Sequence, residues 1–178
     1  MTTTWRHAVV FLPIQDVGSH RFLLLARRRR GKYADCLTPP GGELEVFDTS
    51  LYATAVRESE EELGITPSFP TFYAGGIAIP HYGLALHAFI GRYTGQPQES
   101  EELDQPRPYS VNRLPKGMRP DAYLWVNSTL ERFDAMRYRE PRFLRIVHSD
   151  QGTLRRLDHE WPHDLRLPRQ PWWPPPES

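Results

Sequence analysis

The sequence predicts an α/β (α+β) fold in which a mixed β-sheet is flanked by helices. Two observations predict it: short apolar runs typical of strands occur both before and after two helical segments, and the connections between these segments are short. A length of 178 residues fits one compact domain with a short appendage. We therefore expect a single layered domain, without internal repeats.

The first half of the chain contains two predicted strands, a special loop and one helix. Apolar runs at residues 8–14 and 22–26 flank a turn-forming stretch, which predicts a strand, a turn and a strand. The Pro-Pro-Gly-Gly sequence in residues 38–42 predicts irregular backbone, because proline fixes φ and lacks a donor whereas glycine accepts unusual conformations. A helix is predicted from about residue 49 to 63, with Thr49-Ser50 offering the N-cap and a glycine following its last turn.

The second half predicts more strands and a second helix. Residues 72–80 and 82–93 read as strands, and both faces of the latter are apolar, so we expect it to be covered on both sides. Residues 96–108 are acidic and contain prolines, which predicts a loop. Residues 121–136 predict a helix, and residues 143–157 a hairpin.

Composition bounds the domain organisation and the partners. From Trp161 on, proline, arginine and tryptophan dominate, so we expect a domain over residues 1–160 and an extended or disordered tail over 161–178. Basic and acidic residues number 22 each, which argues against a long nucleic acid or an anionic membrane as partner. A single cysteine, Cys36, and the absence of long apolar runs favour a soluble cytoplasmic protein. A monomer and a homodimer both remain open.

Three glutamates of the first helix carry the strongest chemical signal. Glu58, Glu61 and Glu62 stand at i, i+3 and i+4, so they share one helix face, here called the acidic face. Crowded carboxylates oppose each other's ionisation unless a cation neutralises them, and hard oxygen ligands suit Mg²⁺ or Mn²⁺. Arg57 is placed to orient one of them. The alternative is a solvated acidic surface, but the preceding Pro-Pro-Gly-Gly loop favours a site, since it can bring backbone groups close to a metal or a phosphate.

This segment resembles the Nudix box, G-x5-E-x7-R-E-U-x-E-E-x-G-U, where U is a bulky apolar residue. The second half of the box matches as Arg57-Glu58-Ser59-Glu60-Glu61-Glu62-Leu63-Gly64-Ile65, with Ser59 in place of the apolar U. The first half departs from the pattern. Thr49 stands where the box has glutamate, with Asp48 beside it, and Gly42 precedes Arg57 by fifteen residues instead of fourteen.

The resemblance implies an αβα sandwich with a divalent metal site. It implies that Glu58, Glu61 and Glu62 bind Mg²⁺ or Mn²⁺ together with the carbonyl of Gly42 or Gly41, and that water attacks a phosphorus of a diphosphate. A carboxylate outside the box often completes such a site. Glu102 is the candidate here, with Glu99 and Glu101 as weaker ones, and simple loop solubility as the alternative.

A further resemblance connects the chain with the MutT-like oxidised-purine nucleoside triphosphatases, the 8-oxo-dGTP diphosphatase group. It rests on residues 95–103 and 114–121 and covers roughly residues 8–157. The base-binding Trp-Pro-Asp-Asp of that group reads Arg-Pro-Asp-Ala here, so only Asp121 is retained for substrate binding, with a helix N-cap as its structural alternative. Arg28 and Arg30 follow a strand where related enzymes place a basic residue against substrate phosphates; a solvated strand edge is the alternative.

Three functions follow as hypotheses. The leading one is a Mg²⁺-dependent nucleotide diphosphatase of MutT type that converts a nucleoside triphosphate, with oxidised ones among the candidates, into monophosphate and pyrophosphate. The second is hydrolysis of another nucleoside diphosphate derivative, such as ADP-ribose, a dinucleoside polyphosphate or an RNA cap. In the family, a proline downstream of the box marks enzymes that act on ADP-ribose, and a tyrosine marks those that act on dinucleoside polyphosphates. This chain has both, Pro80 and Tyr82, so the two markers indicate different substrates. The third is a catalytically silent nucleotide-binding module, which the complete acidic face argues against.

Overall fold

The computed structural model describes residues 5–134, 142–148 and 154–158. The predicted tail and the domain boundary near residue 160 lie outside the described residues. In chain order the elements are β1 (Arg6–Val17), β2 (His20–Arg28), β3 (Leu37–Thr38), β4 (Gly41–Glu43), α1 (Leu51–Leu63), β5 (Thr66–Ile79), a 3₁₀ turn η1 (Pro80–Tyr82), β6 (Leu84–Thr94), β7 (Leu103–Ser110), α2 (Pro120–Asp134), β8 (Arg142–His148) and β9 (Leu154–Asp158).

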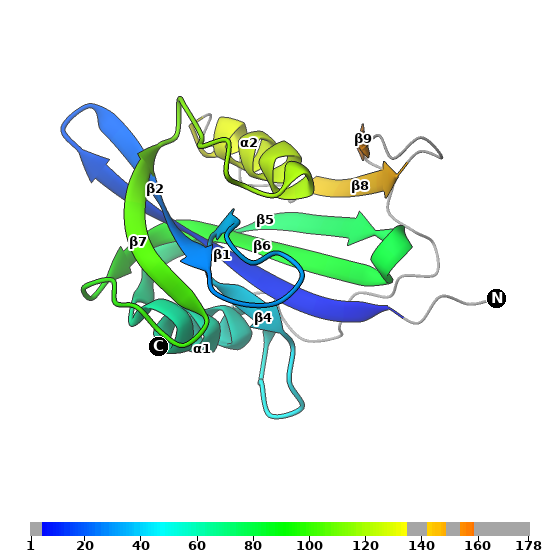
Figure 1. The fold of residues 1–178 in the computed structure, drawn as a ribbon, viewed down its shortest axis with the longest axis horizontal. Coiled ribbons are helices and arrows are strands. Elements are labelled where there is room, and N and C mark those ends of the chain that lie inside the picture. The colour runs from blue at the N-terminus through cyan, green and yellow to red at the C-terminus, as the bar shows by residue number, and fades with distance from the viewer. Residues whose placement is uncertain (1–4, 135–141, 149–153, 159–178) are drawn as a thin grey trace.

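The strands form a mixed sheet in the order β3-β2-β1-β6-β5-β8-β9, with β4 paired to β1 and β7 to β2. The β1–β6 and β5–β8 pairs are parallel, whereas β1–β2 and β5–β6 are antiparallel. Figure 1 shows α1 on one side of the sheet and α2 on the other. The predicted mixed sheet between helices is therefore confirmed.

Alternation along β1 explains the two apolar layers. Val10, Leu12 and Ile14 belong to one buried cluster, which includes Trp125 and Val126 of α2. Val9 and Phe11 belong to the other, which includes Leu51, Ala55 and Leu63 of α1. Successive side chains of a strand point to opposite faces, so the continuous apolar run supplies both layers. The same holds for β6, whose Phe89 and Ile90 lie in different clusters, as the two-sided apolar pattern predicts.

Local chemistry sets the ends of α1. The Ser50 side chain accepts a hydrogen bond from the amide of Ala53, and Gly64 ends the helix in the left-handed region at φ 64°. The helix therefore begins at Leu51, within two residues of the prediction. The predicted hairpin at residues 143–157 corresponds to β8 and β9, which pair antiparallel; its turn lies outside the described residues.

Two sequence-based expectations are wrong. Residues 96–108 do not form a loop throughout, because β7 pairs with β2, with Leu23 opposite Tyr109 and Leu25 opposite Arg107. Prolines are tolerated in such an edge strand, where only one side needs ladder hydrogen bonds. Residues 38–42 are also less irregular than expected, because Gly41 and Gly42 pair with β1 in β4. Among the described residues, no helix is long and apolar enough to cross a membrane.

Candidate functional site

The acidic face of α1 lies against the two glycines of β4. The backbone amide of Gly41 donates a hydrogen bond of 2.8 Å to Oε2 of Glu62, whose exposed fraction is only 6%. A Cβ added to Gly42 would collide with the carboxylate of Glu58, and one added to Gly41 would collide with the backbone carbonyl of Val9. Close approach of the neighbouring backbone therefore requires glycine at position 41, whereas at position 42 a larger residue would displace the carboxylate of Glu58.

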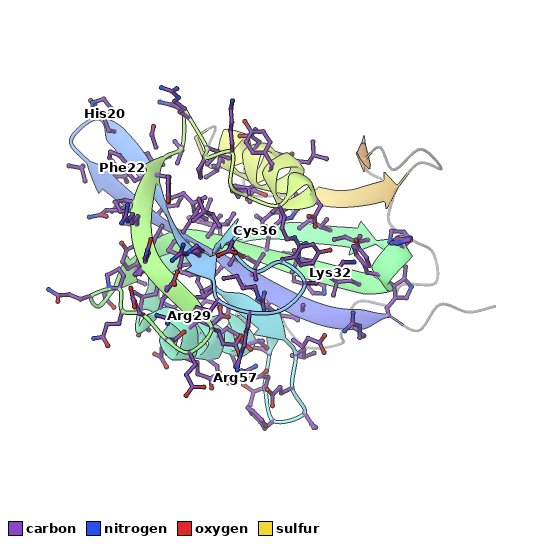
Figure 2. The ribbon with its side chains drawn as sticks, viewed as in Figure 1. His20, Phe22, Arg29, Lys32, Cys36 and Arg57 are labelled. Atoms are coloured by element: carbon purple, nitrogen blue, oxygen red, sulfur yellow. The ribbon has the colours of Figure 1, made fainter. Side chains whose placement is uncertain are left out.

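Arg57 connects the acidic face to the loop that precedes α1. Its guanidinium donates to both carboxylate oxygens of Asp48, at 3.1 and 3.0 Å, and to the carbonyl oxygen of Glu43 at 3.2 Å. It also pairs with Glu58 at 2.7 Å and with Glu61 at 3.0 Å. The hydrogen bonds from Arg57 to Asp48, and then the nearby charge of Glu58, raise the pKa of Arg57. Figure 2 shows Arg57 beside the β4–α1 loop.

Asp48 is a residue whose importance the box pattern did not reveal. Counting back from the arginine leads to Thr49, which is exposed, whereas the Asp48 side chain is only 4% exposed. Besides Arg57, the Asp48 carboxylate accepts hydrogen bonds from the amide of Glu45 and the hydroxyl of Thr54. The loop before α1 has one residue more than the box pattern, and Asp48 is the residue of this loop that pairs with Arg57.

Burial perturbs two carboxylates of the acidic face. Burial raises the pKa of Glu62 to about 8, against the opposing effect of its hydrogen bond from Gly41, and the charges of Glu58 and Glu102 raise it further. Burial also raises the pKa of Glu58, although Arg57 opposes this. A divalent cation would favour ionisation of such groups. Carboxylates and a backbone carbonyl are the hard oxygen donors that Mg²⁺ and Mn²⁺ prefer, so the residue types fit such an ion.

The described residues nevertheless do not form a ready-made metal cage. No group of three or more described His, Cys, Asp or Glu side chains is arranged to hold an ion. The side chain of Glu61 is 60% exposed and is held, like Glu58, by Arg57. Binding of a cation therefore requires these carboxylates to exchange an arginine contact for the ion.

Three predicted residues outside the helix meet at the end of β2. Arg30 donates to Oε1 of Glu102 at 3.1 Å, and Arg28 lies 3.8 Å from its Oε2. The Glu102 carbonyl accepts a hydrogen bond from the amide of Arg29, and Glu99 pairs with Arg29 at 2.7 Å. Since the charges of Arg28 and Glu102 both act on the Glu62 carboxyl, this cluster lies next to the acidic face.

A cavity of about 370 Å³ connects this region with α2. Arg28, Gly41 and Gly42 line one part of it, here called the box end. Four other residues, here called the recognition end, line another part: Tyr33, Tyr82, Arg119 and Trp125. The resemblance places Arg119 at the first position of the base-binding motif and Tyr82 at a marker position, whereas no motif marks Tyr33 or Trp125. A more open hollow of about 820 Å³ is lined by Tyr93, Pro97 and Pro108 among others. No member of the acidic face lines either space, but Gly41 and Gly42, which contact Glu62 and Glu58, line the smaller one.

Asp121 contributes to the recognition end indirectly. It is the second residue of α2 rather than its N-cap, because the helix begins at Pro120. Its carboxylate is buried and accepts two hydrogen bonds from the guanidinium of Arg119. Arg119 in turn lies over the ring of Tyr33, 4.2 Å from its centroid. In this arrangement Asp121 orients Arg119, which itself lines the cavity.

Comparison with known proteins gives a consistent picture. The family model described as NUDIX domain matches residues 5–129. A probable nudix hydrolase of Schizosaccharomyces pombe is 36% identical over 69 residues, which cover 38% of this chain and 24% of the relative. An uncharacterized Nudix hydrolase, NudL, of Escherichia fergusonii is 40% identical over 68 residues, which cover 38% of this chain and 35% of the relative. The chain thus spans about a quarter to a third of the length of these relatives.

Solved structures share the fold. A NUDIX hydrolase from Nitrosomonas europaea superimposes with a TM-score of 0.63 at 20% identity, covering 81% of this chain and 78% of the other. A MutT NUDIX hydrolase from Burkholderia pseudomallei gives 0.59 at 20% identity, covering 68% and 95%. The NUDIX domain of Shewanella oneidensis NrtR, solved in complex with ADP ribose, gives 0.59 at 15% identity, covering 72% and 88%.

Proposed function

Because the chain belongs to the Nudix family, we propose that it is a Mg²⁺-dependent nucleotide diphosphatase of MutT type. It hydrolyses a nucleoside triphosphate, with an oxidised base among the candidates, to the monophosphate and pyrophosphate. The observation that supports this most directly is the buried Glu62, held by the amide of Gly41 beside Glu58 and next to the cavity that Arg28 also lines. A polyphosphate in that cavity would lie between cationic side chains and the acidic face.

The proposed ligands of Mg²⁺, or of Mn²⁺, are the carboxylates of the acidic face, the carboxylate of Glu102 and the carbonyl oxygen of Gly42. When bound, the divalent ion supplies positive charge that offsets the charge of the polyphosphate. Three arginines have further proposed roles. Arg57 holds Glu58 and Glu61 until the ion binds, and Arg28 and Arg30 bind phosphate oxygens once they release Glu102.

The reaction adds water across a phosphoanhydride bond. The water oxygen forms a bond to one phosphorus, the bond from that phosphorus to the bridging oxygen breaks, and a proton of the water passes to a carboxylate of the acidic face. The bridging oxygen leaves with the other phosphoryl group. The exposed carboxylate of Glu61 is accessible to such a water, whereas Glu62 is buried.

A panel of nucleoside triphosphates, with and without oxidised bases, tests the proposal in the presence of Mg²⁺. We expect release of pyrophosphate and monophosphate, loss of turnover with a chelator, and loss of turnover in Glu61→Gln with the fold intact. Glu60→Gln is the matched control, because Glu60 lies on the same helix, is exposed, and its side chain has one described hydrogen bond, accepted from the hydroxyl of Thr66. An unchanged kcat for Glu61→Gln, or no turnover of any nucleotide, would refute the assignment.

A second candidate is hydrolysis of another nucleoside diphosphate derivative. The recognition end is compatible with this second candidate, since its four side chains are placed to contact the organic part of a substrate rather than its phosphates. ADP-ribose, a dinucleoside polyphosphate and a capped RNA fragment belong in the same panel. Their products differ from pyrophosphate, so chromatography of the products separates the two candidates.

A further inference from the structure

Four consecutive arginines, at residues 27–30, divide into two pairs with different partners. Arg28 and Arg30 contact Glu102, at 3.8 and 3.1 Å. The two odd-numbered arginines contact other acidic side chains, at the beginning of β7 and in the turn before it. Successive side chains of an extended chain point to opposite sides. Neighbouring arginines therefore reach different partners, although all four lie at the end of β2 or directly after it.

The odd-numbered arginines form a network of ion pairs. Arg27 donates to both carboxylate oxygens of Asp104, at 2.9 and 3.2 Å. Arg29, labelled in Figure 2, donates to Glu99 at 2.7 Å and lies 3.9 Å from Asp104. The Glu99 carboxylate also accepts a hydrogen bond from the amide of Gln105, at 3.2 Å. These contacts join the end of β2 to both ends of the turn before β7. Four of the side chains are here called the clamp: Arg27, Arg29, Glu99 and Asp104.

Glu102 lies between the two acidic members of the clamp, and its backbone is held as well. Its carbonyl oxygen accepts a hydrogen bond of 2.8 Å from the amide of Arg29, which extends the pairing of β2 with β7. The Ser100 hydroxyl accepts hydrogen bonds from the amides of Glu102 and Leu103. The Leu103 side chain is buried in the apolar cluster that includes residues of α1. All these contacts hold the segment without using the carboxylate of Glu102.

The carboxylate of Glu102 lies close enough to the acidic face for their charges to interact. Burial raises the pKa of Glu58 and Glu62, and the charge of Glu102 adds to the rise at both carboxyls. Mg²⁺ demands a nearly ideal octahedral geometry, with ligand oxygens at about 2.1 Å. A carboxylate on a segment separate from α1 can meet this demand only if the segment is held in place.

Resting on the proposed function, we propose that the clamp positions Glu102 as a ligand of the divalent cation. Arg27 and Arg29 are thereby positioning residues that act through the segment carrying Glu102. The even-numbered arginines remain available for phosphate oxygens. The clamp also engages the Glu99 carboxylate, so this residue belongs to the support of the site and not to the ligands. Exposed ion pairs contribute little to global stability, so the effect of the clamp is on local geometry.

The sign of the effect on cation affinity separates this role from simple electrostatics. An arginine repels a nearby cation, so loss of its charge alone strengthens cation binding. Loss of the clamp weakens binding, because Glu102 is no longer held in place. We expect the double variant Arg27→Gln/Arg29→Gln to bind Mn²⁺ about tenfold more weakly than the unmodified protein. Each single variant should shift the affinity in the same direction. Arg29→Lys should bind Mn²⁺ nearly normally, because lysine can still pair with Glu99.

Titration with Mn²⁺, followed by the electron paramagnetic resonance signal of the free ion, measures this affinity without turnover. Circular dichroism checks that each variant is folded. Arg21→Gln is the matched control, because Arg21 lies at the other end of β2 and pairs with Asp16. It should leave the Mn²⁺ affinity unchanged. Glu102→Gln should weaken Mn²⁺ binding by itself. In that background the double substitution should have no further effect, because a positioning residue acts only through the group that it positions.

Three results would overturn this inference and leave the proposed function standing. The first is unchanged or tighter Mn²⁺ binding by the folded double variant. The second is an unchanged Mn²⁺ affinity in Glu102→Gln. The third is a full loss of affinity on adding the double substitution to Glu102→Gln, because the arginines would then act without Glu102. Absence of Mn²⁺ binding by the unmodified protein would overturn the proposed function and the inference together.

Discussion

Replacing Glu62 by glutamine tests the electrostatics of the acidic face through the stability of the metal-free protein. Glu62 is a buried carboxyl whose pKa burial raises from 4.5 to about 8. Between these two pH values the unfolded chain has lost the proton and the folded chain retains it. Stability falls with rising pH wherever the folded state binds more protons, so this carboxyl destabilises the fold increasingly from pH 4.5 up to about 8.

The magnitude follows from the pKa change. At about 1.4 kcal/mol per pH unit, a rise from 4.5 to about 8 amounts to about 5 kcal/mol at pH 9 and about 3 kcal/mol at pH 7. Glu62→Gln keeps the size of the side chain and an oxygen that can accept the hydrogen bond from Gly41, but it cannot ionise. The variant should therefore match the unmodified protein at pH 5 and exceed its free energy of unfolding by several kcal/mol at pH 9.

Urea unfolding followed by circular dichroism, in a chelator at pH 5, 7 and 9, measures this difference. Other titrating groups are common to both proteins and cancel in the comparison. Glu60→Gln, which alters an exposed carboxylate of the same helix, serves as the control for replacing a glutamate in α1. If the difference between Glu62→Gln and the unmodified protein did not change with pH, the burial argument would be refuted.

Two further substitutions test the geometry around the acidic face. Asp48→Asn should lower the free energy of unfolding by about 2–3 kcal/mol, because a buried carboxylate that accepts four hydrogen bonds loses its charge beside an arginine. Asp16→Asn, in an exposed ion pair, should cost no more than about 1 kcal/mol, and equal losses in thermal unfolding would contradict the contrast. Gly42→Ala should reduce kcat with little loss of stability, since it displaces the movable end of Glu58, whereas Gly41→Ala should destabilise the fold, since it meets the backbone of β1. Similar melting temperatures for the two alanine variants would count against this reading.

The pKa of Asp48 gives its substitution a pH dependence of the opposite sign. Burial of this carboxyl opposes ionisation, but hydrogen bonds from Arg57, the amide of Glu45 and the hydroxyl of Thr54 together hold its pKa below the ordinary value. The stabilisation by Asp48 is therefore fully present at neutral pH and is lost as the pH falls through the lowered pKa. The effect of Asp48→Asn should shrink on acidification, while that of Glu62→Gln grows on alkalinisation.

Features that depend on neighbouring residues in the chain were predictable. Ser50 and Gly64 mark the two ends of α1. The spacing of Glu58, Glu61 and Glu62 places their side chains on one face of the helix. The hydrogen bond from Ala53 to Ser50 and the left-handed Gly64 show the local interactions that set these ends. Capping and helical periodicity act within a few residues, so the sequence contains the information directly.

The loop before α1 shows where counting along the chain fails. The pattern leads to Thr49, but the side chain that reaches Arg57 is Asp48. One extra residue can be accommodated at any of several places in a loop, and the choice depends on which side chain can be buried against the arginine. Residues 96–108 show the same limit, because β7 forms through its pairing with β2, a partner about eighty residues earlier.

By itself, the sequence determined the layered fold class, the limits of α1 and the gathering of carboxylates on one face of that helix, since all of these follow from short-range periodicity and capping. Only the tertiary structure decided that the amide of Gly41 donates a hydrogen bond to Glu62, that Arg30 donates one to Glu102, and that Trp125, a residue of the buried core, also lines a cavity. Contacts of this kind join residues from separate strands and helices. They depend on the order of the strands in the sheet and on which helix covers each face. The pattern of side chains along the chain does not encode the distances between residues of separate elements.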